Sequence, residues 1–192
     1  MVRKPSPEKR ANFLDVALRL FVANGVQNTS TAAITKEAGT AAGTLFLYFP
    51  TKQDLVDTLI LEVSKELLEY VEVRLVETLS AQETFAEIWV GVIHWFRDHL
   101  EAYQYVQHVR DTGLISESAV QESSQYFGYF YIAIQKGLAE GAVKPYPVEL
   151  IGEMLYRAIV AVMNLIKAQP DPAKQEEYIQ AGFDIYWNGI KS

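Results

Sequence analysis

Residues 29–50 read TSTAAITKEAGTAAGTLFLYFP, and this stretch decides the fold. Its leading threonine and serine residues are good N-caps for a short helix, which ends after about two turns at Gly39. A second short helix is predicted over residues 41–48, and Pro50 ends it because proline cannot continue a helix. Two short helices separated by a glycine-bearing turn are typical of a helix-turn-helix unit. We therefore predict a DNA-binding element over residues 29–49.

The residue types of the second short helix suit entry into a major groove that is only about 12 Å wide. Small side chains stand at its leading end, namely Ala41, Ala42, Gly43 and Thr44. A glycine inside a helix costs about 1 kcal/mol relative to alanine, so Gly43 indicates a close approach to DNA or to the neighbouring helix. Lys52 follows at the first position of the next helix, where the helix dipole disfavours a cation unless a phosphate binds there. An ordinary solvated lysine is the alternative interpretation.

Residues 39–55, GTAAGTLFLYFPTKQDL, closely resemble the signature of TetR/AcrR-type transcriptional regulators. Residues 24–34, NGVQNTSTAAI, also look like that family, and the resemblance covers roughly residues 10–56. It implies a homodimer that binds a palindromic operator in double-stranded DNA. It further implies a ligand-responsive repressor that a small hydrophobic effector releases from DNA. The alternatives are an activator or co-repressed regulator of the same fold, because a sequence does not show the sign of the coupling, and a helical carrier of hydrophobic ligands.

The resemblance also implies which residues contact DNA. Phosphate contacts fall to Thr29, Ser30, Tyr48 and Lys52, and base contacts fall to Ala42, Gly43 and Thr44, with Phe46 or Leu47 near thymine methyl groups. Ala41 completes the predicted contact set. Many relatives carry a polar or basic residue where this chain has Ala41 and Ala42, so these two positions depart from the family pattern. Alanine can touch a thymine methyl group but makes no side-chain hydrogen bond. We therefore expect sparse direct readout and a larger share of specificity from DNA shape.

The charge of the chain is unevenly distributed. The 192 residues carry a formal net charge of −7, which by itself argues against nucleic acid as a partner. Residues 1–54, however, hold seven Lys or Arg against four Asp or Glu, whereas the remainder holds ten basic against twenty acidic residues. This asymmetry suggests a nucleic-acid-facing end on an acidic body, although an ordinary basic tail has the same composition. Lys4, Lys9 and Arg10 are candidates for further phosphate contacts, with a disordered arm as the alternative.

Apolar periodicity predicts helices through the rest of the chain, with no strand and no internal repeat. A first helix carries Phe13 and Phe21 on one face and closes at Gly25. Six further helices are expected over residues 51–79, 81–100, 101–110, 116–140, 148–168 and 172–190, and Thr51 and Asp54 resemble a capping box at the start of the first. The predicted fold is all-α. It has an N-terminal three-helix helix-turn-helix DNA-binding domain, residues 1–50, and a six-helix ligand-binding and dimerisation domain, residues 51–192.

Aromatic side chains are frequent in residues 85–131, and five of the six residues from 126 to 131 are aromatic. Aromatic walls with a few polar groups are typical of pockets for apolar ligands, and the resemblance implies such a pocket after residue 51. The candidate lining residues are Trp89, Val92, Tyr105, His108, Phe127 and Tyr131. For each of them, plain packing in the core is the alternative. A drug, a fatty acyl compound or another hydrophobic metabolite fits this composition.

The last two predicted helices are apolar over wide faces. One face carries Ile151, Leu155, Ala158, Ile159, Val162 and Ile166, and the other carries Ile179, Phe183, Tyr186, Trp187 and Ile190. Two such helices from each of two chains can form a four-helix interface with two-fold symmetry, as the resemblance also implies. We therefore expect a homodimer through the last two helices, with packing inside one chain as the alternative. Ligand binding is then expected to tilt the helix at residues 51–79 and change the spacing of the two recognition helices.

Several classes of site have no support in the sequence. Cysteine is absent, which excludes disulfides, zinc–thiolate sites and cysteine nucleophiles and fits a reducing cytoplasm. We find neither a run of about 18 uncharged apolar residues nor a hydrophobic signal region. His94, His99 and His108 lack metal-ligand spacing, and we find no catalytic motif and no phosphate loop. We therefore expect a cytoplasmic regulator that needs no metal or other cofactor and is not an enzyme.

Overall fold

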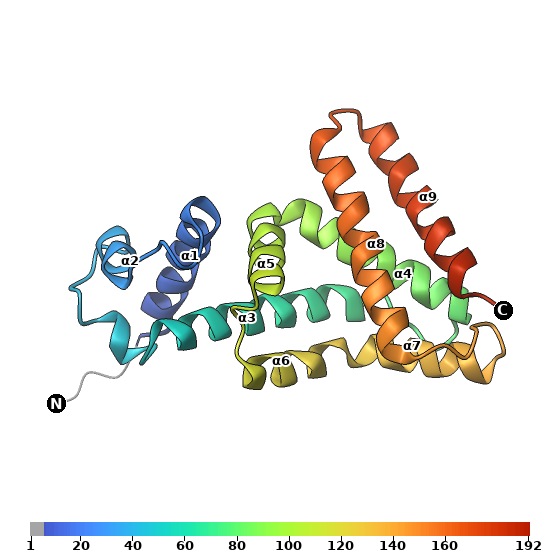
Figure 1. Ribbon diagram of the computed structural model, residues 1–192, viewed down its shortest axis with the longest axis horizontal. Coiled ribbons are helices and arrows are strands. Elements are labelled where there is room, and N and C mark those ends of the chain that lie inside the picture. The colour runs from blue at the N-terminus through green and yellow to red at the C-terminus, as the bar shows by residue number, and fades with distance from the viewer. Residues whose placement is uncertain (1–5) are drawn as a thin grey trace. The chain divides into compact units, whose positions relative to one another are not determined.

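Regular structure in residues 6–192, the part of the chain that the computed structural model describes, is almost entirely helical (Figure 1). The α-helices are α1 (Pro7–Asn24), α2 (Thr31–Glu37), α3 (Lys52–Glu72), α4 (Ala81–Asp98), α5 (Leu100–Thr112), α6 (Glu117–Ser124), α7 (Gly128–Ala139), α8 (Val148–Ala168) and α9 (Pro172–Ile190). Two short 3₁₀ helices are η1 (Leu45–Leu47) and η2 (Gln125–Phe127). An isolated bridge between Val143 and Lys191 is the only β-type pairing in the described residues. The predicted all-α fold is confirmed, and no described helix could span a membrane.

Local sequence signals account for several helix starts. Thr51 and Asp54 form the predicted capping box, because the Thr51 backbone N–H donates to Asp54 Oδ2 (2.8 Å) and the Asp54 N–H donates to Thr51 Oγ1 (3.1 Å). Asp171 caps α9 in the same manner by accepting from the Ala173 N–H at 3.0 Å. These caps satisfy backbone donors that the first turn of a helix leaves without a partner.

One predicted helix ends earlier than expected, and another is divided in two. The helix predicted to reach residue 79 ends at Glu72, and the side chains of Val73 and Val76 beyond it are exposed. β-Branched residues have weak helix propensity, and these two lack the core contacts that would offset it. The helix predicted over residues 116–140 is divided by η2 into α6 and α7, just ahead of a glycine, the residue with the poorest helix propensity after proline.

The chain packs as two compact units. The first unit comprises Met1–Lys65 and His99–Ser123, and the second comprises Glu66–Asp98 and Ser124–Ser192. This division passes inside α3 and between α4 and α5, whereas the predicted domain boundary lies between residues 50 and 51. The predicted boundary concerns function rather than packing, and it stays a prediction.

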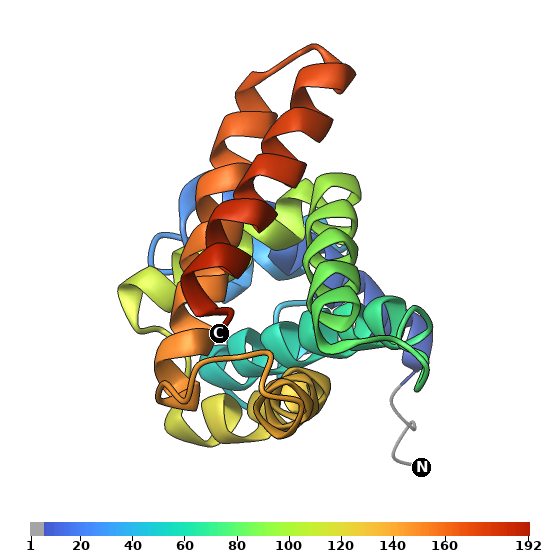
Figure 2. The same ribbon diagram turned by 90° about the vertical axis from the view of Figure 1, so that its right-hand side faces the viewer.

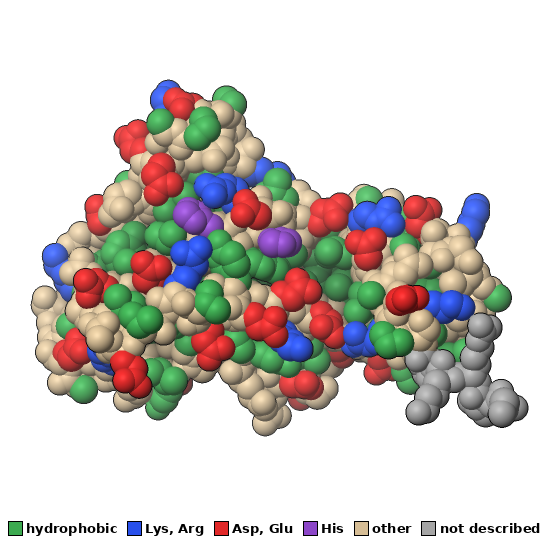
Figure 3. Space-filling model, turned by 180° about the vertical axis from the view of Figure 1, so that it is seen from behind, with side chains coloured by type: hydrophobic (Ala, Val, Ile, Leu, Met, Phe, Trp, Pro, Cys, Tyr) green, Lys and Arg blue, Asp and Glu red, His purple; other side chains and the backbone are tan. Residues whose placement is uncertain are grey.

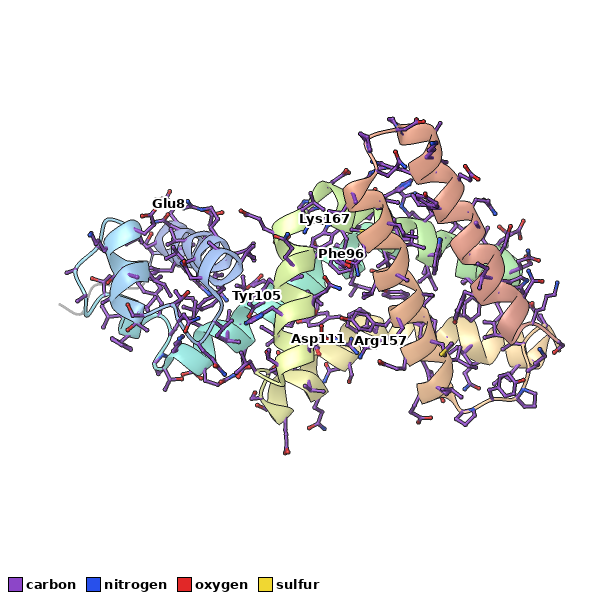
Figure 4. All side chains as sticks on the ribbon, turned by 45° about the horizontal axis from the view of Figure 1, so that its top comes forward. Glu8, Phe96, Tyr105, Asp111, Arg157 and Lys167 are labelled. Atoms are coloured by element: carbon purple, nitrogen blue, oxygen red, sulfur yellow. The ribbon has the colours of Figure 1, made fainter. Side chains whose placement is uncertain are left out.

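The core of the first unit joins the predicted DNA-binding helices to α5. Helix α5 packs against α1, and the ring of Tyr105 on α5 stacks on Phe21 with centroids 6.1 Å apart. Figure 4 labels Tyr105 on α5, and its hydroxyl donates to the carbonyl of Val56 on α3 at 2.8 Å. Burial raises the pKa of the Tyr105 hydroxyl, so it stays a protonated donor. A helix from outside residues 1–50 therefore belongs to the scaffold that holds the helix-turn-helix.

The second unit is built on α4 and on the pair α8–α9, whose helices lie side by side (Figures 1 and 2). Trp89 of α4 is fully buried, its indole N–H donates to the Ile179 carbonyl at 2.9 Å, and its ring stacks on Tyr186. Gly182 of α9 allows the close approach of these helices. A Cβ atom there would lie 2.5 Å from Val162 Cγ2 and 2.8 Å from Trp89 Cζ2. The packing of α9 against α8 and α4 in this unit therefore requires a glycine at position 182.

The apolar faces of α8 and α9 that were expected to pair two chains are mostly buried inside one chain. Ile151, Leu155, Ile159, Val162 and Ile166 of α8 and Ile179, Phe183, Tyr186, Trp187 and Ile190 of α9 are all buried, and Ala158 is partly buried. That part of the prediction was wrong, because both helices carry a second, outward apolar stripe that the sequence analysis did not separate. The outward side chains are Leu150, Met154, Ala161 and Leu165 on α8 and Ala181 and Ile185 on α9.

Candidate DNA-binding surface

The turn before α2 fixes the first part of the candidate surface. Thr29 is 2% exposed, and its hydroxyl lies 2.9 Å from the Gly25 carbonyl and 3.1 Å from the Leu20 carbonyl. These contacts give Thr29 a structural role and argue against the predicted phosphate contact of its side chain. Ser30 is exposed and caps α2, since its Oγ accepts from the Ala33 N–H at 3.1 Å.

The predicted recognition helix over residues 41–48 is not a continuous α-helix. The chain forms short-range turns there, in which the Thr44 N–H donates to Ala41 (2.9 Å) and the Tyr48 N–H donates to Leu45 (2.9 Å), and only Leu45–Leu47 is regular 3₁₀ helix. The predicted short helix is therefore confirmed only in part, as the 3₁₀ helix Leu45–Leu47. Gly43 in the middle disfavours helix, and so short a segment gains few hydrogen bonds once nucleated.

A buried leucine anchors this recognition segment, and its neighbours are exposed. Leu45 is fully buried among α1, α2 and α3 residues, whereas Leu47 is 71% exposed and Phe46 is exposed. Ala41, Ala42 and Gly43 are exposed as well, and Thr44 is partly exposed. Residues 38–50 contain no acidic residue. The segment therefore offers small and apolar groups without negative charge, which suits contact with base edges and thymine methyl groups.

Tyr48 and Lys52 stand at the end of this segment. The ring of Tyr48 packs on Phe13 (centroids 5.5 Å apart), and its hydroxyl accepts from the Ser6 N–H at 2.8 Å. The hydroxyl proton of Tyr48 therefore remains available for a phosphate oxygen. Lys52 Nζ donates to the Gln27 carbonyl at 3.4 Å, and partial burial lowers the pKa of this amine.

The start of α3 is less open to a phosphate than the sequence analysis assumed. The Asp54 carboxylate accepts from both the N–H and the hydroxyl of Thr51 at 2.8 Å, and so it occupies part of the site proposed for an anion. Lys52 therefore remains a candidate phosphate contact because of its own positive charge. Free backbone N–H groups at the start of α3 do not add to this candidacy. The contact of Lys52 with the turn at Gln27 holds that charge beside the helix-turn-helix.

The other predicted cations of the N-terminal region differ in their surroundings. Arg10 pairs with Glu62 at 2.9 Å, and its guanidinium lies over the Phe49 ring. The Arg10 guanidinium therefore already has partners within the chain. Lys9 is exposed, and Lys4 lies outside the described residues. Lys36 on α2 is exposed too, and the sequence analysis did not single it out. Figure 3 shows how acidic side chains are spread over one face of the molecule.

Some residues that hold the surface in place gave no signal in the sequence. Asn12 Nδ2 donates to the Ala38 carbonyl at 3.2 Å and so ties α1 to the end of α2. His108 on α5 accepts from the Val26 N–H at 3.4 Å, across 82 positions of sequence. A pairing over that separation follows from tertiary packing, which helical periodicity does not report.

The residues predicted to line an effector pocket fall in both compact units. Tyr105 and His108 belong to the first unit, where they make the contacts with Val56 and Val26. In the second unit Trp89 and Val92 are buried, whereas Phe127 is 37% and Tyr131 55% exposed. The described geometry therefore supports core packing for Tyr105 and His108. Among the described residues, no cluster of three or more His, Cys, Asp or Glu could hold a metal ion.

Comparisons with known proteins match both parts of the chain. Residues 13–59 match a family model described as bacterial regulatory proteins, tetR family, and residues 60–192 match one described as tetracyclin repressor-like, C-terminal domain. The crystal structure of a putative tetR family transcription regulator from Shewanella sp. PV-4 is similar, with a TM-score of 0.89 and 26% identity over 96% of this chain and 98% of that chain.

Two proteins of Bacillus subtilis are also similar. The transcriptional regulator FadR, crystallised in complex with stearoyl-CoA, has a TM-score of 0.75 and 21% identity, over 94% of this chain and 98% of that chain. The uncharacterised HTH-type transcriptional regulator YhgD of strain 168 is 20% identical over 173 residues, which cover 89% of this chain and 91% of that protein. These matches are transcription regulators rather than enzymes.

Proposed function

The chain belongs to the tetR family of bacterial regulatory proteins, and on that premise we propose that it is a transcriptional repressor acting as a homodimer on a palindromic operator. A small hydrophobic effector releases it from DNA. The observation that carries the proposal is the exposed, acid-free surface of residues 40–48, held on a buried scaffold of α1, α2 and α5. A hydrophobic-ligand carrier has no need of such a surface. The chain acts in the cytoplasm, where its operator lies.

The proposed contacts divide into positioning and reading groups. Ser30, Tyr48 and Lys52 contact phosphates, because a hydroxyl proton or an ammonium group is available at each. Ala41, Ala42, Gly43, Thr44, Phe46 and Leu47 enter the groove. Thr29 supports this set from inside the turn. Since only Thr44 among the groove residues carries a polar side chain, DNA shape supplies much of the specificity.

The outward apolar stripes of α8 and α9 support the homodimer. Leu150, Met154, Ala161 and Leu165 follow one face of α8, and Ala181 and Ile185 lie one turn apart on α9. Two copies of this helix pair bury the stripes against one another in a four-helix interface. A dimer matches two half-sites about one helical turn of DNA apart, which is why the operator is a palindrome.

Composition and fold support the proposed effector class. Trp89, Val92, Phe127 and Tyr131 remain the proposed lining residues in the second unit. FadR was crystallised with stearoyl-CoA, and this likeness of fold makes a hydrophobic effector a reasonable class for this chain. Effector binding acts on α3, which begins in the first compact unit and ends in the second. A tilt of α3 changes the spacing of the two recognition segments and weakens operator binding.

Lys52→Ala and Thr44→Ala are expected to separate phosphate contacts from base reading. Lys52→Ala should lower affinity for operator and scrambled DNA by a similar factor, about three- to tenfold, and reduce the salt dependence by about one ion. Thr44→Ala should instead change the preferred bases. The measurement is a gel-shift titration at several salt concentrations, with an operator selected from random double-stranded DNA.

Lys65→Ala is the matched control, since Lys65 is an exposed lysine further along the same helix. Its affinity for DNA should match that of the unaltered chain. If Lys52→Ala binds both DNAs with unaltered affinity, Lys52 leaves the contact set. If the unaltered chain shows no salt-dependent binding to DNA, the proposal that it binds DNA is wrong. A carrier of hydrophobic ligands would then be the better interpretation.

A reporter gene tests the direction of regulation. The selected operator is placed between a promoter and the reporter, and expression of the chain should lower reporter output. Lys52→Ala should relieve part of this repression, because it binds the operator more weakly. Increased output on expression of the unaltered chain would identify an activator, the alternative function of the same fold.

A further inference from the structure

A groove of about 390 Å³ opens between α4 and α9 in the second unit. Its apolar lining consists of the partly exposed Ala86 and Val90 over the buried side chains of Trp89, Ile179 and Phe183, and its polar rim includes Gln82, Glu83 and Gln180. Only Trp89 belongs to the set predicted for the effector pocket. The volume lies within the range of ligand sites in proteins, which is roughly 300–1,000 Å³.

The floor of the groove is rigid. Trp89 cannot turn, because its indole N–H is bound to the Ile179 carbonyl at 2.9 Å and its ring packs on Phe183 with centroids 6.2 Å apart. Phe183 in turn stacks on Trp187. Ala86 on the α4 side is small, which leaves space above this aromatic layer. The groove is therefore preformed, and a ligand loses little free energy in ordering it.

Among the described residues, Glu83 is the only ionisable one that lines the groove. Its Oε2 atom accepts from the Ser80 N–H (2.8 Å) and the Ser80 hydroxyl (2.7 Å), so the other carboxylate oxygen has lone pairs for a further donor. Hydrogen bonds from the Ser80 hydroxyl and then its backbone lower the pKa of the Glu83 carboxyl. The group is therefore negatively charged at neutral pH, and an anionic ligand is repelled.

The surrounding charges do not cancel that of Glu83. The positive end of the α4 dipole already faces two carboxylates, because the Ala81 N–H donates to Glu140 Oε2 at 3.2 Å. Lys136 is a cation whose charge lowers the pKa of the Glu83 carboxyl slightly further. Its ammonium group pairs with Glu140 at 4.0 Å and also donates to the carbonyls of Glu77 and Leu79. Lys136 is therefore shared between Glu83 and Glu140, and no cationic side chain of residues 6–192 lines the groove.

We infer that this groove binds small amphipathic amines, with the apolar body against the partly exposed Ala86 and Val90 and the ammonium group at Glu83. Charge complementarity selects the ammonium group, and the groove volume of about 390 Å³ limits the size of the apolar body. The inference concerns the second unit alone. It does not rest on the proposed repressor function, so its test needs no DNA.

Three ligands with one apolar body and different head groups test the charge preference. 4-Phenylbutylamine, 4-phenylbutanol and 4-phenylbutyrate are titrated into the full chain at pH 7 and followed by isothermal titration calorimetry. An exposed ion pair contributes little, so the amine should bind about two- to fivefold more tightly than the alcohol, and the acid most weakly. The preference should shrink at high salt. Equal affinity of the three ligands, or no binding by the amine, would overturn the inference.

Substitutions at the rim and in the lining test whether the three ligands bind in this groove. Glu83→Gln keeps the cap of α4, since glutamine serves in a capping box, and should equalise the amine and the alcohol. Glu87→Gln, one turn along the same helix and outside the lining, should keep the preference. Gln180→Trp, at an exposed position, should block all three ligands. Unaltered binding by Gln180→Trp and by Ala86→Phe, together with an unaltered preference in Glu83→Gln, would place the amine site elsewhere.

Discussion

Ile185→Asp is expected to convert the homodimer into monomers and to lower operator affinity about a hundredfold or more. Ile185 is 77% exposed on α9, so the substitution removes no core contact within one chain. In the proposed interface, however, the two-fold axis brings the new carboxylate close to its own copy and to apolar side chains. A monomer binds one half-site only, and it loses the gain in affinity that comes from linking two sites. Sedimentation velocity gives the oligomeric state, and gel-shift titration gives the affinity.

Val73→Asp is the matched control for this experiment. Val73 is 81% exposed in the connection after α3, and it has the same branched apolar character but lies outside α8 and α9. The control adds the same charge, so it matches any general weakening of DNA binding by an extra carboxylate. It should remain dimeric and retain its operator affinity. A dimeric Ile185→Asp variant would show that the chain pairs through another surface.

The interface illustrates a limit of periodicity. In α8 one apolar stripe includes Ile151 and Leu155, and a second includes Leu150 and Met154. The helical spacing identifies both stripes, because each repeats at three and four residues. It does not say which stripe packs inside the chain and which faces outward. That choice depends on the helices brought alongside, and it is visible only in the fold.

Sequence reasoning succeeded where the determining contacts are local. The capping box of Thr51 and Asp54 spans three residues, and the stop at Pro50 depends on one ring. It was only partly correct for the recognition segment, where weak local preferences compete and Gly43 disfavours a continuous helix over residues 41–48. Thr29 shows a further limit, because a hydroxyl that bonds inside a turn looks the same in sequence as one that faces solvent.

Gly182→Ala is expected to destabilise the chain by about 1–2 kcal/mol, although alanine favours helix over glycine by about 1 kcal/mol. The new Cβ atom would lie 2.5 Å from Val162 Cγ2 and 2.8 Å from Trp89 Cζ2. Trp89 cannot retreat, because its indole N–H is bound to the Ile179 carbonyl and the side chain is fully buried. The clash therefore outweighs the gain in propensity. Thermal unfolding should shift downward by about 2–8 °C for a chain of this length.

A second glycine and a compensating substitution make this prediction specific. Gly189 lies on the same helix with open space around its Cβ position, so Gly189→Ala should leave stability unchanged or raise it by a few tenths of a kcal/mol. Val162→Ala removes the nearer clashing methyl group, and in combination with Gly182→Ala it should cost less than the sum of the two single changes. All variants are compared at one protein concentration, because dimerisation makes the unfolding temperature depend on it. Strict additivity of the two substitutions would show that Val162 and residue 182 do not compete for the same space.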